Sequence, residues 1–167
     1  DWKPEGHGHV DLIQSVAQSC DIYYYDLAYQ MGIDAMHDWM TRFGFGLETG
    51  VDLPGERQGV MPSREWKRDN LGEPWYQGET VNTGIGQGFT LATPIQLATS
   101  TAMFANRGAP VRPHLLEPVD SEAIEPPRVE PLTLDDEALW QTAIDAMVEV
   151  VHGPRGTARG IGEDLDY

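Results

Sequence analysis

Residues 19 to 33 read S-C-D-I-Y-Y-Y-D-L-A-Y-Q-M-G-I and begin at a junction between two predicted helices. Apolar side chains recur at helical spacing on both sides of this junction, at Val10, Ile13 and Ala17 before it and at Ile22, Tyr25 and Tyr29 after it. The two helices are therefore expected to meet at Cys20. A junction of this kind exposes side chains to a cleft, so it is the first place to look for function.

A third helix is predicted from Ile33 to Phe43, separated from the second by Gly32 and ended by the glycines at 44 and 46. Residues 49–90 are rich in Gly, Pro and Trp and have few periodic runs, which predicts loops and short strands.

The clearest helix signal follows residue 92. Thr93 can cap the helix, Pro94 suits its first position, and Gln96 completes a capping box. This helix is expected to end at residues 106–108.

The C-terminal part begins with a proline-rich segment, residues 109–132, which contains six prolines and predicts an extended connection. A last helix is predicted from about Thr133 to Gly153, with acidic residues in its first turn. Its proposed apolar face consists of Trp140, Ile144, Met147 and Val151. Together these elements predict an α+β fold represented mainly by a helical lobe, with a sheet that is incomplete in this chain.

Composition narrows the classes of function. The 167 residues include 27 acidic and 11 basic side chains, giving a formal charge of -16, which argues against nucleic-acid binding. The 40% of apolar residues can form a core, and no stretch reaches the length of a membrane helix. The single cysteine excludes an internal disulfide and leaves the redox compartment open.

Ser19 and Asp21 are the first candidate functional pair. In an extended link, side chains two apart point the same way, so both could face a substrate while Cys20 faces the protein interior. The alternative is that Ser19 or Asp21 simply caps the second helix. No serine can be matched with a histidine and an aspartate as a catalytic triad.

Asp1, His7 and Cys20 are side-chain types that bind Zn²⁺. A structural zinc site normally has four ligands, so the fourth would come from elsewhere, and His9 is an alternative to His7. The other interpretation is that Cys20 is a small buried apolar residue and G-H-G-H is a turn.

Residues 84–88, G-I-G-Q-G, precede a helix start and invite comparison with a phosphate-binding loop. The Lys-Ser/Thr pair and the glycine spacing of such loops are missing, so a tight turn is the better interpretation.

Five motifs occur together in this chain: S-C-D-I-Y-Y-Y-D, F-G-F-G-L-E-T-G-V-D-L-P-G-E, M-P-S-R-E-W-K, P-W-Y-Q-G-E-T and G-I-G-Q-G-F-T-L-A-T-P-I-Q-L-A. In this order and spacing they resemble the transpeptidase domain of the penicillin-binding protein 2 family, the class B elongation-type enzymes of Gram-negative bacteria. The resemblance covers nearly the whole chain, apart from the acidic residues 119–131.

The resemblance implies a serine-type D,D-transpeptidase that crosslinks peptidoglycan stem peptides during cell-wall elongation and is acylated by β-lactams. It implies a role in cell shape at the periplasmic face of the inner membrane, with an N-terminal anchor outside this chain. A RodA-like SEDS glycosyltransferase and a MreC-like scaffold are the implied partners.

Family members use three motifs, S-x-x-K, S-x-N or S-x-D, and K-S/T-G. Ser19 and Asp21 match the second, which implies that Ser19 relays a proton between the catalytic lysine and the leaving group, while Asp21 positions the lysine or substrate amide. The other two motifs do not occur between Asp1 and Tyr167. We therefore expect residues 1–167 to be a partial transpeptidase domain that is inactive alone.

Many Gram-negative members also carry a structural zinc, and the resemblance assigns Asp1, His7 and Cys20 to its ligand set, with a further aspartate upstream. Two alternative functions remain open. One is a penicillin-recognising sensor or β-lactamase, which would hydrolyse rather than transfer. The other is a non-enzymatic, zinc-stabilised interaction module.

Overall fold

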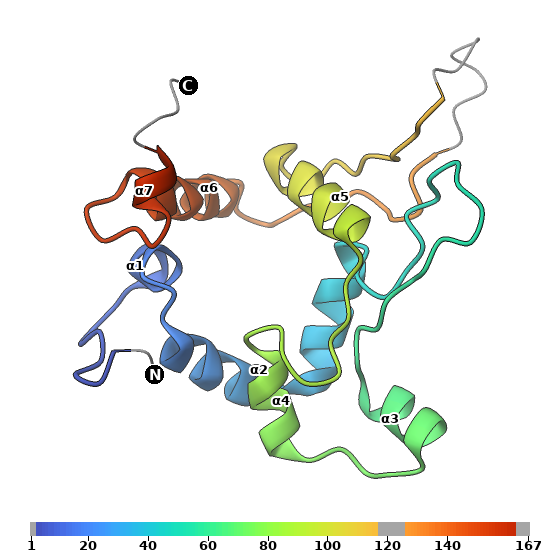
Figure 1. The fold of residues 1–167 in the computed structure, drawn as a ribbon, viewed down its shortest axis with the longest axis horizontal. Helices are drawn as coiled ribbons and strands as arrows, with labels where there is room; N and C mark the ends of the chain where they lie inside the picture. Colours follow the sequence, from blue (N-terminus) through green and yellow to red (C-terminus); the bar gives the residue numbers. More distant parts are fainter. Residues whose placement is uncertain (1–2, 117–125, 163–167) are drawn as a thin grey trace. The chain divides into compact units, whose positions relative to one another are not determined.

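The computed structural model describes residues 3–116 and 126–162, in which seven helices form (Figure 1). The chain divides into two compact units. The first unit comprises Asp1–Leu27 and Leu134–Tyr167, and the second comprises Ala28–Thr133. No helix in the described ranges is both long and apolar enough to cross a membrane.

The first unit contains α1 (Leu12–Ala17), the start of α2 (Asp21–Arg42), α6 (Ala138–His152) and α7 (Arg159–Gly162). Asp11 caps α1 by accepting a hydrogen bond of 2.8 Å from the backbone N of Gln14. Helix α1 packs against α6, and α6 contacts α7 (Figure 1). Ala17, Trp140 and Ala146 are buried in this unit, so α1 is fixed on the helix that leads into the 153–158 loop.

The second unit contains the rest of α2, together with α3 (Arg64–Leu71), α4 (Gln77–Thr83) and α5 (Pro94–Ala105). Its apolar cluster consists of Ala28, Met36 and Met61, with Met40 and Phe45 packed against it. His37 extends this contact because its Nδ1 lies 3.0 Å from the backbone O of Met61.

Gln96 ties the loops of the second unit to α5. Its Oε1 accepts from the backbone N of Thr93 at 2.9 Å, which completes the predicted capping box. Its Nε2 donates to the backbone O of Leu47 and of Gln58, both at 2.7 Å. Since Gln96 is only 1% exposed, its buried amide has a partner on both its oxygen and its nitrogen.

A buried lysine joins α3 to α4. Lys67 is 1% exposed, and its Nζ lies 2.5 Å from Oε1 of Glu79 and 3.5 Å from Oε2 of Glu73. The same ammonium lies 4.7 Å from the centre of the Tyr76 ring. Burial alone would lower the pKa of Lys67, but the hydrogen bond and charge of Glu79, with help from Glu73, raise it. The lysine therefore stays charged and holds the two helices together.

Several predicted helix boundaries are confirmed. Gly32 interrupts α2 with φ 76° and ψ 160°, which is non-helical backbone between the second and third predicted helices. Helix α5 begins after Thr93, and its C-cap is Asn106. Helix α6 ends at Gly153, as the Gly-Pro pair predicted.

The prediction of loops and short strands across residues 49–90 is wrong at residues 64–71 and 77–83, where α3 and α4 lie, whereas the rest of this stretch contains no helix. Both helices are short and lack an apolar stripe, so periodicity did not reveal them. Local caps hold them instead: Ser63 accepts from the backbone N of Trp66 at 3.0 Å, and Glu79 accepts from the backbone N of Tyr76 at 2.8 Å. In the described ranges, the β-structure consists of one isolated antiparallel bridge between Val60 and Leu91.

The predicted start of the last helix at Thr133 is also wrong, since α6 begins at Ala138. The acidic residues lie before the helix, where Oδ1 of Asp136 accepts from the backbone N of Ala138 at 2.9 Å. The predicted apolar face is only partly buried, because Trp140 is 2% exposed whereas Met147 is 45% exposed. Residues 109–116 and 126–132 contain neither helix nor strand, as their prolines predicted.

Candidate functional site

The junction between α1 and α2 is a tight turn with Ser19 at its centre. The backbone N of Cys20 donates to the O of Ser15 at 2.9 Å, and the N of Ser19 donates to the O of Val16 at 3.1 Å. This is the Schellman pattern that closes a helix end, and it places Ser19 in the left-handed region, with φ 49°. Glycine usually occupies this position because a Cβ disfavours it.

The expected extended link from Ser19 to Asp21 is therefore wrong. Ser19 belongs to the left-handed turn, and Asp21 is already the first residue of α2. Ser19 is exposed, Asp21 is partly exposed, and Cys20 is buried at 5% exposure. The turn, rather than strand-like alternation, accounts for the different exposure of these three neighbours.

The hydroxyl of Ser19 pairs with a residue far away in sequence. Ser19 Oγ lies 3.3 Å from Thr157 Oγ1, and either oxygen can be the donor. The loop carrying Thr157 is fixed at two points, because the backbone N of Thr157 donates to the O of Ala17 at 3.1 Å and the N of Ala158 donates to the O of Val150 at 3.0 Å. Sequence reasoning missed Thr157, since a Gly-Thr pair after a helix signals only a loop.

Tyr24 contacts the α1 side of the junction. Its hydroxyl lies 3.2 Å from Oγ of Ser15, and the Ser15 hydroxyl donates to the backbone O of Leu12 at 2.7 Å. Burial raises the pKa of Tyr24 above its usual value of 10.0. The neutral phenol therefore persists at physiological pH and links α1 to the first turns of α2.

The candidate metal ligands are placed only in part. Cys20 is a buried free thiol, and His7 is partly buried, whereas Asp1 lies outside the described residues. His7 lines a broad open pocket with Lys3, Glu5, Gln18 and Arg155. The alternative ligand His9 is exposed. Among residues 3–116 and 126–162, no three His, Cys, Asp or Glu side chains gather as a metal-binding group.

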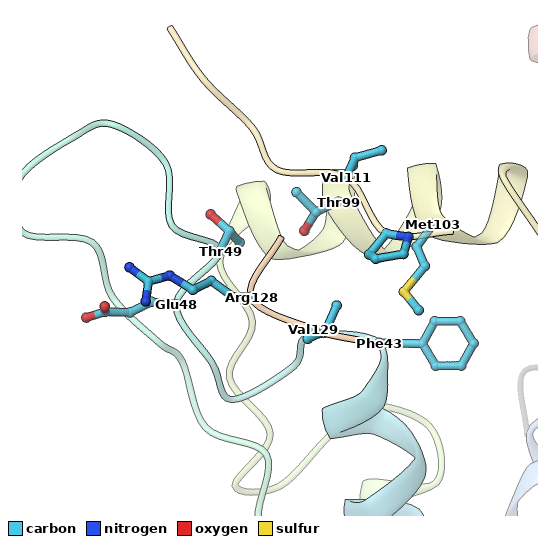
Figure 2. Close-up of a pocket in the computed structure, with 10 residues that line it drawn as sticks. Phe43, Glu48, Thr49, Thr99, Met103, Val111, Arg128 and Val129 are labelled. Atoms are coloured by element: carbon cyan, nitrogen blue, oxygen red, sulfur yellow. The ribbon is translucent and has the colours of Figure 1, made fainter. Parts of the chain in front are cut away.

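The second unit has a narrow pocket that contains none of the predicted site residues. Figure 2 shows Phe43 and Met103 at one end of this pocket, with Arg128 and Glu48 at the other. Its lining is mainly apolar, which is typical of packing between α2, α5 and the neighbouring loops.

The glycine-rich motif at residues 84–88 forms the predicted tight turn. Gly86 and Gly88 have φ values of 73° and 72°, and the backbone N of Gln87 donates to the O of Asn82 at 3.0 Å. Gly86 therefore lies in the turn that closes the end of α4.

The class of protein follows from these motifs and from comparison with known families. All 167 residues match the family model described as the penicillin binding protein transpeptidase domain. The chain therefore belongs to this family.

Its relatives include proteins named peptidoglycan D,D-transpeptidase MrdA. The protein from Haemophilus influenzae is 40% identical over 100% of this chain and 26% of the relative. The protein from Escherichia coli K12 is 43% identical over 95% of this chain and 26% of the relative. The chain thus spans about a quarter of the length of these curated relatives.

Solved structures of penicillin-binding proteins are also similar to this chain. Pseudomonas aeruginosa PBP2, in complex with WCK 5153, superposes with a TM-score of 0.89 and 46% identity over 99% of this chain and 38% of that chain. Helicobacter pylori PBP2, in complex with MreC, gives a TM-score of 0.86 and 34% identity over 96% of this chain and 29% of that chain. The predicted α+β penicillin-binding fold, represented here by a helical lobe, is confirmed.

Proposed function

We propose that this chain is part of a peptidoglycan D,D-transpeptidase that crosslinks stem peptides during cell-wall elongation through a serine acyl-enzyme. Membership of the transpeptidase family and the names of the MrdA relatives support the reaction. The observation that carries the proposal at the level of residues is the exposed Ser19 hydroxyl, held in a left-handed turn beside Asp21.

The proposed role of Ser19 is proton relay. A hydroxyl can accept one proton while it donates its own, so it can connect a lysine base with a leaving-group nitrogen without a net change in charge. Asp21, in the first turn of α2, would orient the lysine or a substrate amide. The nucleophile and the oxyanion strand would come from S-x-x-K and K-S/T-G motifs that this sequence does not contain.

A structural zinc is a further part of the proposal. The imidazole of His7 and the thiol of Cys20 suit Zn²⁺, and Cys20 is buried directly between Ser19 and Asp21 in sequence. With Asp1 and an upstream aspartate, these residues would hold the ion. Zinc would then supply no chemistry to the substrate but would hold the loop that contains Ser19 and Asp21 in place. Metal analysis of the purified protein and its Cys20→Ser variant tests this: zinc should be near one equivalent in the first and lost in the second.

The proposed setting is the periplasmic face of the inner membrane, where β-lactams, a RodA-like glycosyltransferase and a MreC-like scaffold would bind the whole protein. Two solved relatives support the partners. The H. pylori PBP2 structure contains MreC, and a relative at 32% identity and a TM-score of 0.77 belongs to a peptidoglycan synthase complex described as coordinating polymerization and crosslinking.

The decisive experiment follows acylation by mass. The protein expressed from its whole gene is incubated with benzylpenicillin, and intact mass is followed with time. A stable adduct of one drug per protein is expected, with slower formation in Ser19→Ala and Asp21→Ala. Asp38→Ala is the matched control, because Asp38 is an exposed aspartate on the same helix. Rapid release of hydrolysed drug would indicate a β-lactamase instead.

A further inference from the structure

We propose that Thr157 is a positioning residue for the proton-relay hydroxyl of Ser19. This inference rests on the proposed function, because it assigns a partner to the residue that performs the relay. The two hydroxyl oxygens lie 3.3 Å apart although the residues are separated by 138 positions. Both residues belong to the first unit.

The Thr157 backbone is placed by two helices at once. Its own N donates to the C-terminal end of α1, at the O of Ala17. The next residue, Ala158, donates to the O of Val150 on α6. Because α1 packs directly on α6, these two hydrogen bonds hold Thr157 against the turn that contains Ser19.

Gly156 permits this close approach. A Cβ at Gly156 would lie 2.3 Å from the O of Val150 and 2.5 Å from the O of Glu149, and both atoms are backbone that cannot rotate away. The loop therefore passes against the last turns of α6 with no room for a side chain at the residue before Thr157. A loop held this tightly can fix the position of a hydroxyl on its neighbour.

The left-handed backbone and the Thr157 hydroxyl together restrict Ser19. The turn fixes the direction of its Cβ, and Thr157 Oγ1 contacts its Oγ. When Thr157 donates, the Ser19 proton is free to leave toward the leaving group as another proton arrives from the base. The protonation of Ser19 and Thr157 is the same before and after this exchange, so Thr157 contributes geometry rather than a proton.

The test measures acylation of the whole-gene protein by a fluorescent penicillin, with the rate constant separated from the dissociation constant of the non-covalent complex. Thr157→Val removes the hydroxyl and keeps the shape, and it should lower the rate constant about three- to tenfold with an unchanged dissociation constant. Thr157→Ser should restore the rate. Thr142→Val is the matched control, because the Thr142 hydroxyl donates within α6 to the O of Ala138 and should have no effect.

A double-mutant cycle separates positioning from general support of the fold. In a Ser19→Ala background, Thr157→Val should cause no further loss, since the hydroxyl it positions has gone. An equal loss in both backgrounds would overturn the inference, as would an unchanged rate in Thr157→Val. Thr157→Ala replaces Thr157→Val if thermal unfolding shows that the valine variant is not folded. If the unsubstituted protein forms no adduct, the proposed function itself fails; if it does and Thr157→Val is normal, only this inference fails.

Discussion

Two helix ends in this protein use the same backbone turn with different residues. Ser19, with φ 49°, lies in the turn after α1, and Gly44, with φ 91°, lies in the turn after α2. At the second turn the backbone N of Phe45 donates to the O of Met40 at 3.1 Å, and the N of Gly44 donates to the O of Thr41 at 2.9 Å. Both are Schellman closures, so the backbone requirement at the two positions is the same.

The difference between the two turns is the residue that occupies the left-handed position. Glycine adopts this conformation freely, whereas a residue with a Cβ loses about 1 kcal/mol or more. The turn after α5 also contains a left-handed non-glycine residue, Arg107 with φ 53°, so the conformation alone does not indicate function. What marks Ser19 is the combination of this turn, an exposed hydroxyl and its contact with Thr157.

Ser19→Gly should produce the largest effect, and it should separate stability from function. Acylation of the whole protein by penicillin should fall by about a hundredfold or more, because the hydroxyl that we propose as the proton relay is lost. The free energy of unfolding should rise by up to about 1 kcal/mol, because the left-handed strain is relieved. Denaturant unfolding and a labelling time course measure the two quantities on one sample.

Ser19→Ala is the matched control for this experiment. It removes the hydroxyl but keeps the Cβ, so it should lose the same activity without any gain in stability. Undiminished labelling of Ser19→Gly would show that the turn, and not the hydroxyl, is what the protein requires at this position.

Gly156→Ala should destabilise the first unit most strongly. Its new methyl group would overlap the backbone oxygens of Val150 and Glu149, and overpacking of this kind costs about 1 to 3 kcal/mol. Gly160→Ala is the control, since its Cβ would meet nothing within 4 Å. Thermal unfolding of the two variants should differ clearly; equal melting temperatures would mean that the 153–158 loop is not held against α6.

Gly44→Ala tests the conformational requirement of the left-handed turn after α2. A Cβ there would meet its nearest neighbour, Cγ1 of Val129, only at 4.0 Å, so the cost should be the left-handed conformation alone. We expect a loss of about 1 kcal/mol in the free energy of unfolding, opposite in sign to Ser19→Gly. Gly78→Ala, in α4 with no close neighbour, should lose nothing. A loss at Gly78 as large as at Gly44 would contradict the conformational explanation.

Local signals explain which helices could be predicted. Helix α5 was found because Thr93, Pro94 and Gln96 contain the whole capping pattern within four residues. The additional bonds from Gln96 to Leu47 and Gln58 could not be predicted, since they join loops 49 and 38 positions away. Helices α3 and α4 were missed because caps and a buried ion pair stabilise them instead of an apolar stripe.

The candidate site likewise combines residues with a local sequence signal and contacts that depend on tertiary packing. Ser19 and Asp21 could be singled out because they are neighbours in a motif, and their roles stay predictions. The left-handed backbone at Ser19 has no sequence signal, since serine rarely occupies such a position. The contact between Ser19 and Thr157 could not be predicted, because it depends on the packing of α1 on α6. The contribution of Asp1 to a metal site also stays a prediction, as it lies outside the described residues.

Acid should weaken the turn at Thr49 and Gly50 but not the turn at Ser19, because of these two turns only the first is hydrogen-bonded to a carboxylate. Glu56 accepts hydrogen bonds from the Thr49 backbone N at 2.7 Å, the Thr49 hydroxyl at 2.5 Å and the Gly50 backbone N at 3.0 Å. Partial burial alone would raise the pKa of Glu56, but these hydrogen bonds lower it below its ordinary value of 4.5.

The sign of the pH effect follows from this lowered pKa. Above pH 4.5 the carboxylate is ionised in the folded and unfolded states, and its hydrogen bonds stabilise the fold. As the pH falls below 4.5, the unfolded state binds the proton first, so this contribution declines through the lower pKa of the folded state. Glu56→Gln should therefore cost about 0.5 to 1 kcal/mol at pH 7, after allowance for solvent screening, and the cost should shrink in acid. The free energies of unfolding of the unsubstituted protein and of Glu56→Gln, measured from pH 7 to pH 4, give this cost. The difference in unfolding free energy between Ser19→Gly and Ser19→Ala should stay constant over the same range. A constant penalty for Glu56→Gln would mean that the shape of the side chain, and not its charge, holds the Thr49 turn.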